Sequence, residues 1–197
     1  MLTGHFALGA AAKPVAPRVP LWALLLAPML MDFLFWILAL AGIEGVSPSG
    51  VRSYPPQNDQ FHYHDYSHSL LVAVVLSLAV LLAYRTIRGR RASGPGARKS
   101  WTEGLVLAGL VFSHWPADLL THLPEMPILP GNLGGLPTFG LELAAKPPAA
   151  LVVEVVMAIS AVVFYFFWAK SRRPSARWYV GPAVTAALLA LTVPMTA

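Results

Sequence analysis

The chain of 197 residues is 56% hydrophobic and only 12% charged. Soluble domains carry about 25% charged residues, so this composition excludes an ordinary soluble domain and indicates an integral membrane protein. The formal net charge is +5, but the basic residues lie between apolar segments, which argues for membrane topology and against nucleic-acid binding. Because the chain has no cysteine, any metal ion must be held by histidine and carboxylate side chains.

The first apolar segment, residues 1–12, is too short to cross a bilayer, because a spanning helix needs about 20 apolar residues. We interpret it as a short helix that packs against the rest of the molecule. A basic, proline-rich linker follows, and then come five longer apolar segments that we predict to span the membrane: 20–42, 68–87, 101–122, 148–169 and 177–196. At about 1.5 Å per residue each can cross a ~30 Å hydrocarbon core, the last only marginally. The sequence therefore predicts one domain, residues 1–197, an all-α polytopic transmembrane helical bundle.

The basic residues predict the orientation of this bundle. Twelve of the 14 Lys and Arg residues fall on one side, at positions 13 and 18 and in the loops 85–99 and 170–177. By the positive-inside rule this side is cytoplasmic. The segments 43–67 and 123–147 then face the outer side.

The third spanning segment carries a polar stripe of His114, Asp118 and His122. Their spacing of i, i+4 and i+8 places them on one face of a helix. Ionisable groups inside a bilayer are expensive, and they usually face a polar interior, a partner or a metal ion. The stripe is therefore a candidate functional site.

Other polar residues are predicted at a similar depth, in the outer half of the bundle. Counted from the cytoplasmic end, Asp32 lies about 18 Å and His114 about 20 Å along their helices. Glu154 lies about 9 Å below the outer end of its helix, and His5 lies near the midplane if its segment is helical.

A further group of polar residues stands at the outer end of the second spanning segment. His68 opens that segment, and His62, His64 and Asp65 come just before it. In a helical continuation His64 and His68 are i and i+4. All six histidines are thus expected to converge on one region of the bundle.

Imidazole and carboxylate groups together suit Zn²⁺ first, with Mn²⁺ and Fe²⁺ as alternatives. A divalent metal with an open coordination position lowers the pKa of a bound water towards about 7, as hydrolysis requires. We predict a metal centre held by six ligands: His5, Asp32, His64, His68, His114 and Asp118. We predict that His122, Glu154 and Asp65 act as general base, as leaving-group acid or as residues that orient the ligand imidazoles.

Two other functions fit the same residues. Intramembrane His and Asp residues can form an ion or proton pathway in a transporter or channel. They can also lock helix pairing by hydrogen bonds in a non-catalytic membrane scaffold. The segment 123–147 is long, rich in Pro and Gly and apolar enough to lie among lipid headgroups, as functional lids and binding loops do. We expect membrane lipids as partners and a lipid or lipid-linked substrate.

Four pieces of the sequence carry a family resemblance: Gly4-His5-Phe6-Ala7-Leu8-Gly9, Pro28-x-x-x-Asp32, Tyr66-Ser67-His68-Ser69-Leu70 and Ser113-His114-Trp115-x-x-Asp118-Leu119-Leu120-Thr121-His122. With them the chain resembles a bacterial family of membrane-bound metal-dependent hydrolases, which are integral inner-membrane proteins. The resemblance implies a multi-pass protein of the bacterial inner membrane that hydrolyses an ester or phosphoester. Family members often carry a histidine five residues before the one in Ser-His-Ser. Here His64 lies four and His62 six residues before it, so either can be that ligand.

Overall fold

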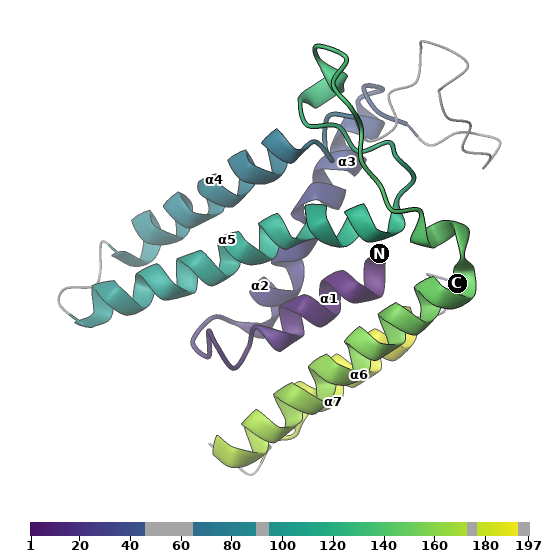
Figure 1. The fold of residues 1–197 in the computed structure, drawn as a ribbon. Helices are drawn as coiled ribbons and strands as arrows, with labels where there is room; N and C mark the ends of the chain where they lie inside the picture. The colour runs from purple at the N-terminus through teal and green to yellow at the C-terminus, as the bar shows by residue number, and fades with distance from the viewer. Residues whose placement is uncertain (46–64, 90–94, 173–176, 193–197) are drawn as a thin grey trace.

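The fold is known from a computed structural model that describes residues 1–45, 65–89, 95–172 and 177–192 (Figure 1). Within this part of the chain the regular elements are helices: α1 (Leu2–Ala11), α2 (Leu21–Leu26), η1 (Ala27–Met29), α3 (Leu30–Leu40), α4 (Leu70–Gly89), α5 (Pro95–Thr121), η2 (Pro130–Asn132), η3 (Leu143–Ala145), α6 (Pro147–Arg172) and α7 (Val180–Thr192). One isolated bridge joins Met126 to Phe139. The all-α prediction is confirmed.

Four stretches are long and apolar enough to cross a membrane: Leu21–Leu40, Leu70–Arg88, Ser100–Thr121 and Pro147–Arg172. They coincide with the first four predicted spans. The fifth predicted segment contains α7, an apolar helix of 13 described residues, which is shorter than the four spans. Its last residues, 193–196, lie outside the described part of the chain.

The first span is interrupted at Pro28, where α2 passes into η1 and then α3. Proline has no backbone N–H and its ring crowds the preceding turn, so it breaks a regular α-helix. At this break the carbonyl oxygen of Pro28 lies 2.6 Å from Nδ1 of His114. The interruption therefore turns a backbone acceptor towards the polar stripe of α5.

The short N-terminal helix packs inside the bundle, as the sequence predicted. Figure 1 shows α1 between α2 and α5 on one side and α6 on the other, with α4 and α5 antiparallel neighbours and α6 paired with α7. Small residues allow this close packing: a Cβ atom at Gly9 would collide with the carbonyl group of Leu24. Two apolar clusters fill the interior, one around Leu24 and Val111 and one around Ala10 and Leu189.

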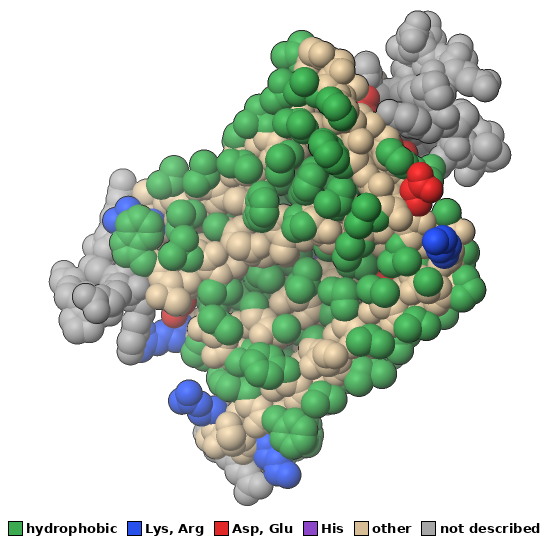
Figure 2. Space-filling view, in the orientation of Figure 1, with side chains coloured by type: hydrophobic (Ala, Val, Ile, Leu, Met, Phe, Trp, Pro, Cys, Tyr) green, Lys and Arg blue, Asp and Glu red, His purple; other side chains and the backbone are tan. Residues whose placement is uncertain are grey.

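The surface of the helices is apolar, as lipid contact requires. Side chains such as Trp22, Leu82 and Ile159 are more than half exposed. Figure 2 shows hydrophobic side chains over the flanks of the bundle, whereas most of the Lys and Arg side chains gather where α4 meets α5 and α6 meets α7. Together with the four spans, this surface is that of a helical membrane protein.

Residues 122–142 cover the opposite end of the bundle, which we call the loop end. The N–H groups of Leu70 and Leu71, at the start of α4, donate to the carbonyls of Pro127 and Ile128, both at 3.0 Å. The first N–H groups of a helix have no partner within it, so this loop supplies them. The loop thus fixes the start of α4 beside the end of α5.

Candidate metal centre

A buried cluster of histidine and aspartate side chains lies near the loop end. It brings together five of the six predicted ligands, namely His5 from α1, Asp32 from α3, His68 just before α4, and His114 and Asp118 from α5. Four of them are at most 2% exposed, whereas the Asp32 side chain is 30% exposed. The sixth, His64, lies outside the described residues, as does His62. The five described side chains form two groups that can hold a metal ion and that share His114. One group adds His5 and Asp118, and the other adds Asp32 and His68.

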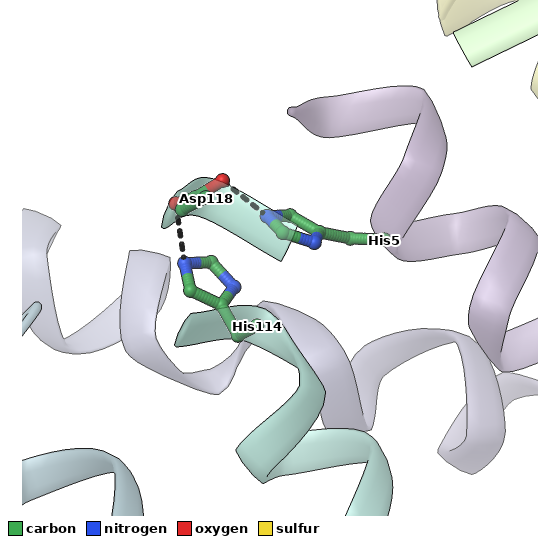
Figure 3. Close-up of side chains that lie close together, drawn as sticks. All are labelled: His5, His114 and Asp118. Atoms are coloured by element: carbon green, nitrogen blue, oxygen red, sulfur yellow. Dashed lines mark ion pairs between the residues drawn. The ribbon is translucent and has the colours of Figure 1, made fainter. Parts of the chain in front are cut away.

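Asp118 is the centre of this cluster, because both of its carboxylate oxygens face imidazoles (Figure 3). Its Oδ1 lies 3.0 Å from Nε2 of His5, and its Oδ2 lies 3.0 Å from Nε2 of His114. Nε2 of His122, the third residue of the predicted stripe, lies 3.5 Å from Oδ2. The α-amino group of Met1 also donates to Oδ1, at 3.0 Å. The i, i+4, i+8 spacing thus brings the three side chains of the stripe together as the sequence predicted.

The imidazoles of His68 and His114 converge with both aspartates. Their Nε2 atoms are 3.1 Å apart, and Oδ1 of Asp32 lies 3.5 Å from the first and 3.7 Å from the second. Oδ2 of Asp118 lies 3.6 Å from Nε2 of His68. Ligand atoms at 2.0–2.1 Å from a tetrahedral Zn²⁺ are separated by about 3.3 Å. The five observed separations are therefore close to the spacing of donors around one ion, with Asp32 and Asp118 each near both imidazoles.

The other nitrogens of these two imidazoles have partners of their own. Nδ1 of His114 lies against the carbonyl of Pro28, which can only accept, so this nitrogen carries the proton. Nδ1 of His68 lies 2.8 Å from Oγ of Ser67. Such outer hydrogen bonds fix the tautomer and the ring orientation of metal-ligating histidines. The contact with Pro28 leaves the Nε2 lone pair of His114 directed into the cluster, and the contact with Ser67 holds the ring of His68.

His5 is buried without a hydrogen bond to either ring nitrogen. Its Nε2 lies within ion-pair distance of Asp118, but the angles do not make a hydrogen bond. Its ring stacks on that of His114, with centroids 4.0 Å apart and an angle of 23° between the planes. A buried polar atom without a hydrogen-bond partner lowers the stability of a fold by about 1–3 kcal/mol, so a ligand bound to the lone pair of His5 would remove this penalty.

Two acidic residues that the sequence did not single out support the cluster. The buried carboxylate of Glu44 accepts hydrogen bonds from the backbone N–H groups of Tyr66 and Ser67, at 2.8 and 2.9 Å. It therefore fixes the turn that presents His68. Only the fold joins Glu44 to residues more than 20 positions later, so no local pattern could have revealed the contact.

The second of these acids is Glu125, whose Oε1 lies 2.8 Å from Nδ1 of His122. Burial disfavours a charged imidazole at His122, but the hydrogen bonds to Asp118 and Glu125 outweigh it and raise its pKa to about 9. The i, i+3 spacing of His122 and Glu125 was visible in the sequence and could have predicted this pair.

Glu154 and Asp65 were predicted to be catalytic. Glu154 is buried in α6, and its Oε2 accepts a hydrogen bond from the backbone N–H of Thr3 at 3.0 Å. This contact satisfies one of the free N–H groups in the first turn of α1, the turn before His5. The backbone carbonyl of Asp65 accepts from the N–H of Gly131 at 3.0 Å. The catalytic roles of both residues stay predictions.

Fold and site together define a helical membrane protein with a buried His/Asp cluster that can hold a metal ion. Comparisons of the chain with models of known protein families, with curated proteins and with solved structures found no match. The resemblance to membrane-bound hydrolases therefore remains a prediction.

Proposed function

We propose that the protein is a metal-dependent membrane hydrolase that cleaves an ester or phosphoester bond of a lipid or a lipid-linked substrate. The observation that carries this proposal is that the Nε2 atoms of His68 and His114 lie 3.1 Å apart and that each lies 3.0–3.7 Å from oxygens of both Asp32 and Asp118. Their imidazole and carboxylate chemistry favours Zn²⁺. A bound Zn²⁺ would polarise the scissile group and lower the pKa of a coordinated water.

The residues around these donors have separate tasks. His114 and His68 are held by Pro28 and Ser67, so their rings are oriented before an ion arrives. In the hydrolysis, water adds to the acyl carbon or the phosphorus, the bond to the leaving oxygen breaks, and that oxygen takes up a proton. His122 lies between Asp118 and Glu125 and is placed to carry this proton.

The loop end supports a lipid substrate. Leu133 and Leu141 are 71% and 66% exposed, and other loop residues are apolar as well. The N–H of Leu141 donates to the carbonyl of Leu119, and that of Glu142 to the carbonyl of His122, so the apolar loop is attached directly to the end of the site helix. An apolar surface beside the site is suited to contact acyl chains. With the positive-inside rule, we place the site on the outer side of the bacterial inner membrane.

One observation favours a second candidate, a proton or ion pathway. Asp118, His122 and Glu125 form a continuous row that runs from a side chain with 2% exposure to one with 12%. Rows of this kind serve proton transfer in pumps and transporters. Flux into liposomes that depends on Asp118, without hydrolysis of any ester, would favour this function over the hydrolase.

Elemental analysis of purified protein tests the metal. We expect bound zinc in the wild type and its loss in His114→Ala and Asp118→Asn, while Ser113→Ala keeps it. Ser113 is a matched control because, within the described part of the chain, its hydroxyl donates to the Leu110 carbonyl of its own helix and has no other hydrogen-bond partner. A wild type without metal refutes the proposal. If the variants then lose stability, and neither they nor the wild type bind metal, the scaffold is supported. Hydrolysis of phospholipid vesicles, abolished by a chelator and restored by Zn²⁺, tests the reaction.

A further inference from the structure

The carboxylate of Asp118 presents its two oxygens to different imidazoles. Oδ2 faces His114, and with it the donors of His68 and Asp32, whereas Oδ1 faces His5. A single tetrahedral ion at the four donors described above uses only Oδ2. The lone pair of His5 then remains for another ligand, beside Oδ1, which the α-amino group of Met1 also contacts.

The ring geometry indicates what that ligand is. His5 and His114 lie nearly parallel with centroids 4.0 Å apart, and each directs Nε2 to its own oxygen of Asp118 (Figure 3). Two stacked imidazoles of this kind present their lone pairs at two neighbouring positions, separated by about the stacking distance. In two-metal hydrolytic sites the ions are about 3.5–4 Å apart. The stacking distance and this ion spacing agree.

A simple ion pair is the other explanation for His5. A charged imidazole beside Asp118 would donate a hydrogen bond to Oδ1, but neither ring nitrogen of His5 has hydrogen-bond geometry. Oδ1 is also the acceptor of the Met1 α-amino group. The side chain is 1% exposed, so water does not replace the missing partner at the surface. A divalent cation at this position gives His5 the ligand that it lacks, and it takes the place of the Met1 α-amino group at Oδ1.

We propose that the centre binds a second divalent cation, held by His5 Nε2 and Asp118 Oδ1, with Asp118 as the bridge between the two ions. This inference rests on the proposed function, because it requires the first ion. The first position has four protein donors and the second has two, so the second ion binds more weakly and keeps more positions open for water and substrate.

The charges of such a centre select a substrate class. The cluster contributes two carboxylates, Asp32 and Asp118, which balance one divalent cation, and the α-amino group of Met1 adds a positive charge beside Asp118. A second cation leaves an excess of positive charge in a buried site, which an anionic group of the substrate must neutralise. The two-ion centre therefore favours a phosphoester over a carboxylic ester, and two-metal sites are common in phosphoester hydrolysis.

Metal stoichiometry tests this inference. Full-length protein in detergent is freed of metal with a chelator and dialysed against increasing Zn²⁺, and bound zinc is measured by elemental analysis. We expect two zinc ions per chain in the wild type and in Ser113→Ala, bound with different affinities, and one in His5→Ala and His5→Phe. Asp118→Asn, which removes the bridging carboxylate, is expected to lose both ions.

The outcomes separate the two proposals. One ion in the wild type, unchanged in the His5 variants, overturns the second site and leaves the hydrolase centre intact. Wild-type protein that binds no zinc overturns both proposals. Two ions in the wild type and two in His5→Ala place the second ion elsewhere and also overturn the inference. Because the His5 variants risk misfolding, wild-type protein loaded with Mn²⁺ gives an independent result: an exchange-coupled pair spectrum is expected, and a spectrum of isolated ions contradicts it.

Discussion

Glu44 is the most informative supporting residue to change, because it touches no donor atom of the cluster described here. Its carboxylate accepts the N–H groups of Tyr66 and Ser67, and Ser67 in turn contacts Nδ1 of His68. We predict that Glu44→Ala destabilises the fold and weakens zinc binding, whereas Glu44→Gln, which keeps an acceptor oxygen, does so much less.

The magnitude follows from the burial of the two donors. The N–H of Ser67 belongs to a fully buried residue, so its loss of an acceptor costs about 1–3 kcal/mol, whereas half-buried Tyr66 can bind water instead. A total of about 2–4 kcal/mol is expected for Glu44→Ala and about 1 kcal/mol for Glu44→Gln. Removing an outer partner of a metal-ligating histidine typically weakens metal binding about 10–100-fold.

Two assays read the two effects. Equilibrium unfolding in detergent gives the stability, and dialysis against buffered Zn²⁺ gives the affinity, with Ser113→Ala as the control for both. If Glu44→Ala is folded and binds zinc as tightly as the wild type, Glu44 does not position His68. If Glu44→Gln is as damaged as Glu44→Ala, the negative charge matters and the accepted hydrogen bonds do not.

Three further predictions follow from the same geometry. Glu154→Ala removes the acceptor of the Thr3 N–H at the start of α1, so we expect the free energy of unfolding to fall by about 1–3 kcal/mol. Because α1 carries His5, the variant should lose the weaker zinc ion before the tighter one. Equal loss of both ions would contradict this. The fold raises the pKa of His122 from 6.5 to about 9, so protonated His122 stabilises the metal-free protein by up to about 3 kcal/mol. This contribution is complete below pH 6.5 and is lost as the pH rises to 9. The free energy of unfolding should therefore fall across this range in the wild type and change less in His122→Gln. Inorganic phosphate should inhibit hydrolysis competitively at concentrations where acetate does not, and equal inhibition by both anions would argue against a phosphoester substrate.

The sequence predicted which polar side chains lie together where helical periodicity decides their placement. His114 and Asp118 share a helix face by spacing alone, and the bilayer cost of ionisable groups marked Asp32 as their partner at similar depth. The structure brings these residues together with His5 and His68. A depth count gives height along a helix but not rotation about its axis, so it placed Glu154 near the site without showing that its carboxylate holds Thr3.

Other features needed the tertiary structure. The contact of Glu44 with the turn before His68 joins segments far apart in the chain, and the stacking of His5 on His114 depends on how closely α1 approaches α5. The fifth predicted segment shows that apolar composition alone does not give the length of a helix. Mean hydropathy over 177–196 suggests a span, but the described helix α7 has 13 residues.

The central claim is that Asp32, His68, His114 and Asp118 surround a metal ion. Zinc-edge X-ray absorption on the purified protein tests it most directly. We predict a shell of nitrogen and oxygen ligands at about 2.0–2.1 Å, with the outer scattering of imidazole rings, and loss of that signal in His114→Ala but not in Ser113→Ala. A zinc spectrum without imidazole scattering, or one that His114→Ala leaves unchanged, would contradict it.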